Sequence, residues 1–118
     1  MSRAKRTIAI DFDGVLHQYN GFKGADVFSD PMPHARERVE ELLARGHEVV
    51  VFTTRIAALV REWLQKHEFP ALSVTCVKQP FWLIIDDRAL RFDGDWAKLT
   101  VADIESAEPY WVKRRKNG

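Results

Sequence analysis

Apolar residues along the chain form short continuous runs that alternate with amphipathic stretches of helical period. The runs TIAI at 7–10, EVVVF at 48–52, LSVTCV at 72–77 and FWLII at 81–85 are apolar at nearly every position, as in strands buried on both faces. Apolar residues recur at helical spacing over about 35–43 and 56–64. The pattern predicts an α/β fold in which a parallel, Rossmann-like sheet is flanked by helices and covered on both faces.

Proline, glycine and capping residues indicate where these helices begin and end. The DPMP stretch at 30–33 supplies prolines suited to a first helical turn, and Gly46 is placed to end that helix. Pro70 stops the second helix. Thr100 with Asp103 has the spacing of a capping box, which predicts a short last helix.

Length and composition limit the class of protein. With 118 residues, 46% of them hydrophobic and 30% charged, the chain is predicted to be one globular domain over 1–118, with a core of about 7–108 and a basic tail at 109–118. The longest apolar runs fall far short of the roughly 20 residues that cross a membrane. The first residues contain no signal-peptide core, which favours a cytoplasmic location.

The net charge of +1 conceals an uneven distribution. Seven of the 18 basic residues lie at the ends (Arg3, Lys5, Arg6 and 113–116), which leaves 11 basic and 17 acidic residues within 7–108. Basic ends on an acidic body suit contact with an anionic polymer, although a short charge run is more often a solvated tail. Nucleic acid therefore stays open as a partner with weak support.

Some residue types give little functional signal. The lone Cys76, in a strand-like setting, is expected to be a small buried hydrophobe. Trp96 is expected to anchor packing. The four histidines show no metal-ligand spacing and are expected at the surface or partly packed: His17, His34, His47 and His67.

Polar side chains gather where the predicted strands end, and ligands of parallel sheets bind at the carboxyl ends of strands. These side chains are Asp11 and Asp13 after the first strand, Thr53, Thr54 and Arg55 after the second, Lys78 ahead of the fourth, and Asp86 and Asp87 after it. Carboxylates brought close together resist ionising, so a cation is expected among them. A set of oxygen ligands favours Mg²⁺ over zinc.

These stretches resemble a known enzyme family. DFDGVL at 11–16 is similar to the first signature of the haloacid dehalogenase (HAD) superfamily of phosphohydrolases, VVVFTTR at 49–55 to the second, Lys78 to the third, and LIIDDRA at 83–89 to the acidic fourth. The four occur in the family's order and cover roughly residues 7–92. Each is a weak pattern alone, whereas the ordered set is specific.

The resemblance implies roles for the acidic residues. Asp11 would be the nucleophile that takes the phosphoryl group as an aspartyl-phosphate, and Asp13 the general acid and base. The expected Mg²⁺ set is Asp11, the backbone carbonyl of Asp13, and the paired aspartates, of which Asp87 is the expected direct ligand and Asp86 lies behind it.

The same resemblance implies roles for the groups that hold phosphate. One of Thr53 and Thr54 would donate a hydrogen bond to the phosphoryl group, and Thr53 is preferred because it is the first polar residue after its strand. Lys78 would neutralise phosphate charge. Arg55 either binds phosphate at the start of a helix or is an exposed charge, and the sequence favours neither.

The function implied is that of a Mg²⁺-dependent phosphomonoester hydrolase. The chain has no room for the cap domain of many relatives, so an open site is expected, suited to a small phosphorylated molecule or a phosphorylated macromolecular end. No membrane partner is expected, and the oligomeric state is left open. The rival interpretation is a catalytically silent HAD-like scaffold that binds nucleic acid or a protein. A response-regulator receiver fits less well, because no aspartate ends a middle strand.

Overall fold

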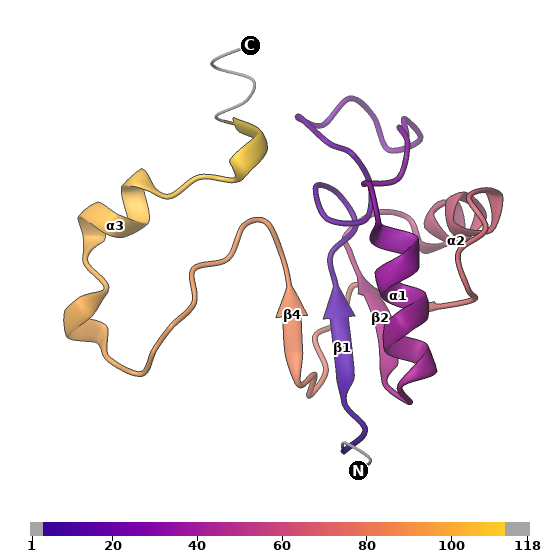
Figure 1. Cartoon of the computed structure of the whole chain (residues 1–118). Coiled ribbons are helices and arrows are strands. Elements are labelled where there is room, and N and C mark those ends of the chain that lie inside the picture. The colour runs from indigo at the N-terminus through magenta and orange to yellow at the C-terminus, as the bar shows by residue number, and fades with distance from the viewer. Residues whose placement is uncertain (1–3, 113–118) are drawn as a thin grey trace.

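The computed structural model describes residues 4–112 (Figure 1). Along the chain, the elements are β1 (Thr7–Ile10), α1 (Ala35–Ala44), β2 (Glu48–Phe52), α2 (Ala57–Lys66), β3 (Ser73–Thr75), β4 (Leu83–Ile85), the 3₁₀ helix η1 (Trp96–Lys98) and α3 (Val101–Ser106). The predicted strands at 72–77 and 81–85 are confirmed but shorter. The first helix begins two residues after Pro33, so the prolines precede its first turn.

The strands form one parallel sheet in the order β3-β2-β1-β4. In its register, Ile8 of β1 lies between Val49 of β2 and Leu83 of β4. The carboxyl ends of all four strands therefore meet at one edge. The α/β class predicted from the sequence is confirmed.

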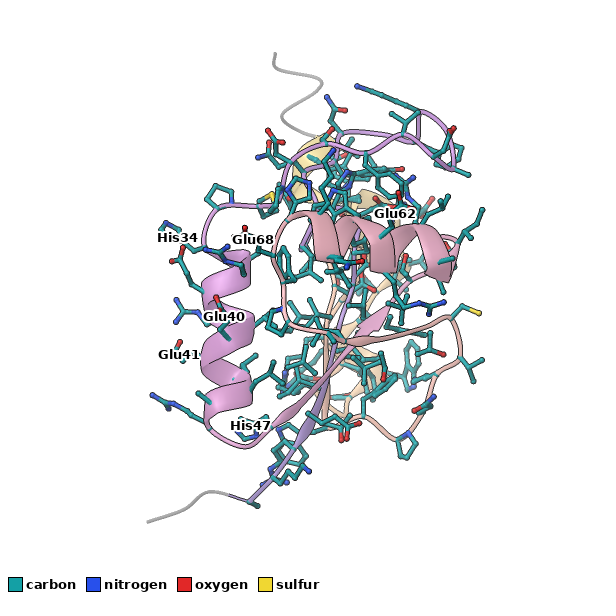
Figure 2. The ribbon with its side chains drawn as sticks, turned by 90° about the vertical axis from the view of Figure 1, so that its right-hand side faces the viewer. His34, Glu40, Glu41, His47, Glu62 and Glu68 are labelled. Carbon is teal, nitrogen blue, oxygen red and sulfur yellow. The ribbon has the colours of Figure 1, made fainter. Side chains whose placement is uncertain are left out.

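Both long helices cover the same face of the sheet. Alternate residues of β1 and β2, among them Ile10 and Val51, face this helix layer and form the buried core with it. The helices contribute Val39 from α1 and Val60, Trp63 and Leu64 from α2. Figure 2 shows His34 at the start of α1 and His47 just beyond its end.

The second face of the sheet carries no helix of the described chain. It is crossed instead by residues 76–82, which link β3 to β4 at the opposite edge of the sheet. Phe81 in this segment contacts Phe52, with 5.6 Å between ring centroids. Ala9 and Val50, whose side chains alternate with those on the helix face, are buried. The sequence predicted that both faces of the sheet are covered. Helices cover one face, and the segment 76–82 crosses the other.

Three expectations about single positions are corrected. Cys76 is exposed, because β3 ends at Thr75 and Cys76 begins the crossing segment. Trp96 is 71% exposed and anchors no core. The packed part of the chain continues beyond residue 108, since Trp111 is buried.

The basic ends are only partly visible. Arg3 and the basic residues at 113–116 lie outside the described residues. Within 4–112, no helix is both long and apolar enough to cross a membrane.

Candidate active site

The carboxyl ends of β1, β2 and β4 open into a cavity of about 530 Å³. Six of the predicted site residues line it: Asp11, Asp13, Thr53, Thr54, Arg55 and Asp86. Asp87 joins them through the acidic cluster described below. Lys78 is exposed in the segment that crosses the second face and is not among the lining residues.

Asp11, Asp86 and Asp87 form an acidic cluster in which one carboxylate oxygen from each lies within 4.8 Å of the others. The backbone N–H of Phe12 donates to Asp11 Oδ1 at 2.8 Å. Burial, the close approach of the Asp87 carboxyl and the charge of Asp86 nevertheless raise the pKa of Asp11 to about 8. Asp11 therefore resists carrying its negative charge unless a cation lies beside it.

Asp87 offers a buried oxygen that lacks a donor. Its Oδ2 accepts a hydrogen bond of 2.5 Å from the indole N–H of Trp111, whereas Oδ1 is enclosed and has no hydrogen-bond partner within residues 4–112. Gly14, at a φ of 82°, lies so close to Asp87 that a Cβ would collide with the carboxylate. An unpartnered carboxylate oxygen beside two further carboxylates fits a hard cation such as Mg²⁺.

Asp13 is held in a different way, by positively charged and polar neighbours. Arg55 donates two hydrogen bonds to its carboxylate, from Nε to Oδ2 at 2.9 Å and from Nη2 to Oδ1 at 3.0 Å. His17 Nδ1 lies 3.0 Å from Asp13 Oδ1. Although burial alone would raise the pKa of Asp13, the hydrogen bonds from His17 and Arg55 outweigh it and lower that pKa. Asp13 is therefore an ionised carboxylate in this arrangement.

His17 connects Asp13 to the loop that we call the flap, residues 20–30. The backbone N–H of Ser29 donates to His17 Nε2 at 2.6 Å, so Nδ1 carries the ring proton and donates it to Asp13. The ring is buried and stacks on Phe12, with 4.8 Å between centroids. The expectation that all four histidines are surface or partly packed residues is wrong at this position.

Arg55 fastens the flap to the sheet. Besides the Asp13 carboxylate, its guanidinium donates to three flap carbonyls, those of Gly24, Ala25 and Val27. Its side chain is only 5% exposed. Of the two roles left open for Arg55, the exposed charge is excluded, and the N–H groups it would offer to phosphate are largely committed to Asp13 and the flap.

The two threonines differ in burial. Thr53 is buried, and its Oγ1 accepts a hydrogen bond of 3.1 Å from the backbone N–H of Arg55. Because Oγ1 acts as the acceptor there, the hydroxyl proton of Thr53 is free to point into the cavity. Thr54 is exposed and also lines the cavity.

Besides His17, three site residues were missed from the sequence, and two of them lie far along the chain from the groups they contact. Trp111 lies 24 residues after Asp87 yet donates to it, and the Tyr110 hydroxyl donates to the Gly14 carbonyl at 2.5 Å. Arg88 lines the cavity, with its guanidinium 5.1 Å from the Trp111 ring centroid. Only the position of Arg88, next to the paired aspartates, gave a signal that sequence reasoning could have used.

The chain was compared with known proteins. No protein-family model matches it, and no curated protein matches it significantly. Among solved structures, it is similar to a conserved protein of Bacteroides thetaiotaomicron, with 23% sequence identity and a TM-score of 0.61 over 88% of this chain and all of the other. At this identity, the similarity supports the α/β fold and carries no statement about function.

Proposed function

We propose that the protein is a Mg²⁺-dependent phosphomonoester hydrolase of the HAD type, without a cap domain, that acts through an aspartyl-phosphate. The observation that carries the proposal is the convergence of Asp11, Asp86 and Asp87 from two strand ends around an enclosed oxygen of Asp87 that has no donor within residues 4–112. This acidic cluster opens on the same cavity as Asp13 and Thr53.

Asp11 is the proposed nucleophile. Its Oδ1 accepts the Phe12 N–H, which leaves Oδ2 to attack phosphorus while the bond from phosphorus to the alcohol oxygen breaks. Water then attacks the phosphorus of the aspartyl-phosphate, inorganic phosphate leaves, and the Asp11 carboxylate is restored. Bound Mg²⁺ would supply the positive charge that keeps Asp11 ionised and offsets the charge of the substrate phosphate.

Asp13 is the proposed general acid and base. Its contacts in this structure favour the role of base and oppose the role of acid. Its lowered pKa favours the ionised carboxylate, which is the form that takes a proton from the attacking water in the second step. Delivering a proton to the leaving alcohol in the first step requires the protonated carboxyl. Since Arg55 favours the charged form, the acid role requires Arg55 to release Asp13, and with it the flap.

Positive charge for the phosphate is proposed to come from Arg88 as well as from the predicted Lys78. Arg88 already lines the cavity, whereas Lys78 lies outside its lining in this arrangement. Thr53 is preferred over Thr54 as the hydroxyl donor because it is fixed by burial and by its contact with Arg55. Replacing Arg88 and Lys78 one at a time should show which of them binds the phosphate.

The first test is hydrolysis of a panel of phosphomonoesters, including an aryl phosphate, sugar phosphates, nucleotides and phosphorylated oligonucleotide ends, with Mg²⁺ and with EDTA. Asp11→Asn should lower turnover at least about 1000-fold, equivalent to about 4 kcal/mol in the barrier, and Asp93→Asn is the matched exposed control. Folding is checked by circular dichroism. Activity that persists in Asp11→Asn rejects the nucleophile, and a wild-type protein inactive on the whole panel favours the silent scaffold.

A further inference from the structure

Strand β4 forms an edge of the sheet that nothing in the described chain covers. It pairs with β1 on one side only. Leu83 and Ile85 lie opposite Ile8 and Ile10, so they belong to the face that carries the helices. Those helices pack over β2 and β3, and Leu83 and Ile85 remain 43% and 45% exposed. An apolar strand edge of this kind is a ready site for association.

The chain that follows β4 exposes further apolar side chains. We call residues 90–109 the C-terminal excursion, since the chain leaves the sheet after Asp87 and returns at Tyr110 and Trp111 to contact the active site. In Figure 1 the excursion lies beside the β4 edge. Its helix α3 packs against no other helix or strand of residues 4–112. Its exposed apolar residues are Leu90, Phe92, Trp96, Val101 and Ile104.

The dimensions of the chain are those of an open molecule, not of a compact one. Its radius of gyration is 15.7 Å, against about 13.5 Å for a compact domain of this length. Its solvent-accessible surface is 8507 Å², against about 6600 Å² for a compact monomer of 13.7 kDa. The excess of roughly 1900 Å² is a total for the whole molecule, to which the β4 edge and the excursion contribute, and it exceeds the ~800 Å² that each partner buries in an ordinary stable interface.

This surface needs a strand to pair with the β4 edge and apolar cover for Leu83 and Ile85, and a second copy of the same chain supplies both. Folding the excursion down onto its own sheet would cover Leu83 and Ile85 but leave the outer N–H and C=O groups of β4 without a strand. A second β4, related by a twofold axis, pairs with that edge in the antiparallel sense. The excursion of each copy then has the apolar flank of the other to cover.

We propose that two copies associate through the β4 edge and the apolar residues of the C-terminal excursion, as a twofold dimer with one continuous sheet. The interface lies beside the active site, because Asp86 and Asp87 directly follow β4. This inference does not depend on the proposed phosphatase activity, and its test measures mass rather than turnover.

The test is the mass of the full chain in solution, measured by size-exclusion chromatography with light scattering from micromolar to millimolar concentration. The expected mass is twice the 13.7 kDa of one chain. The double variant Trp96→Glu with Ile104→Glu should shift it to one chain, and unchanged circular dichroism checks folding. The control is Val77→Glu, which changes an exposed apolar residue just beyond β3, at the other edge of the sheet; Val77 is 61% exposed, against 71% for Trp96 and 49% for Ile104.

Each other outcome overturns the proposal. A wild-type monomer throughout the concentration range rejects it, and X-ray scattering then shows whether the excursion has folded onto its own sheet, with a radius of gyration near the compact value. A dimer that survives the double variant, or one that Val77→Glu dissociates, places the interface elsewhere. An assembly larger than two chains rejects the closed twofold arrangement.

Discussion

On the flank of the sheet formed by β2 and β3, two ten-residue helices pack over the strands, whereas on the flank formed by β4 no helix of the described chain does. We call these the packed flank and the bare flank. The packed flank holds the buried core, including Val51, Val60 and Trp63. The bare flank exposes Leu83 and Ile85, and the active site lies where the two flanks meet.

The helices of the two regions are stabilised differently. Neither α1 nor α2 has a side-chain cap at its start, where His34 and Ile56 stand. The six-residue α3 has a complete capping box, in which Thr100 and Asp103 satisfy each other's backbone N–H groups. Helices that bury an apolar face can do without a cap, whereas a short helix with no packing partner depends on local hydrogen bonds.

The largest expected difference between the flanks is in the free energy of unfolding. Trp63→Ala should lower it by about 3–5 kcal/mol, because the ring is 4% exposed, sits in the core and donates to the Ser29 carbonyl at 2.9 Å. Trp96→Ala should change it by less than about 0.5 kcal/mol. Chemical denaturation at low protein concentration, where a dimer is dissociated, measures both. Similar losses would show that the bare flank is packed in the monomer.

The contrast explains which parts of the fold the sequence could predict. Apolar runs located all four strands, and helical periods located α1 and α2, which bury one face on the packed flank. The last helix, α3, was predicted from its capping box, and η1 was not predicted. The same rule misjudged Trp96, because a hydrophobic side chain indicates that a surface needs covering without saying which chain covers it. Cys76 was misjudged for a related reason, since the apolar run continues past the point where β3 ends.

The candidate site was predictable to the extent that it is local in sequence. The ends of β1, β2 and β4 carry the aspartates and threonines that meet in the cavity. The contacts of His17 with Ser29 and of Trp111 with Asp87 span 12 and 24 residues, and no periodicity links them. The hydrogen bonds from Arg55 to the flap carbonyls likewise could not be predicted, because they depend on how the flap folds.

The next largest expected effect is on Mg²⁺ binding by Asp86 and Asp87, which follow β4 on the bare flank. Asp87→Asn should raise the Mg²⁺ concentration for half-maximal rate on the order of 100-fold, or about 2.7 kcal/mol, because the enclosed Oδ1 is lost as a charged ligand. Asp86→Asn should raise it much less, since Asp86 is exposed and its Oδ1 already accepts the Arg88 N–H at 2.8 Å. Mg²⁺-dependent shifts in melting temperature give a readout without turnover. Equal effects would contradict the preference for Asp87.

A smaller effect is expected from the two cations proposed to face the phosphate. Arg88→Ala should raise KM for a phosphomonoester by about 10-fold, because a charged contact to the phosphate contributes roughly 1.5 kcal/mol or more. Lys78→Ala should change KM less, since Lys78 lies outside the cavity lining. A larger effect at Lys78 would show that the segment 76–82 moves toward the site when substrate binds and would restore the role predicted from the sequence.

The smallest expected effect is at the capping box of α3, where local and global stability should separate. Thr100→Ala removes the acceptor for the Asp103 N–H at 3.1 Å, which costs about 1 kcal/mol within the helix. Because α3 contacts no other helix or strand of residues 4–112, little of that loss should reach the free energy of unfolding of the sheet. Amide exchange should therefore quicken across Val101–Ser106 and stay unchanged in β1 and β2, both measured on the monomeric double variant to keep the interface out of the comparison. If exchange in β1 quickened as well, α3 would be coupled to the core, and the two flanks would have to be treated as one cooperative unit.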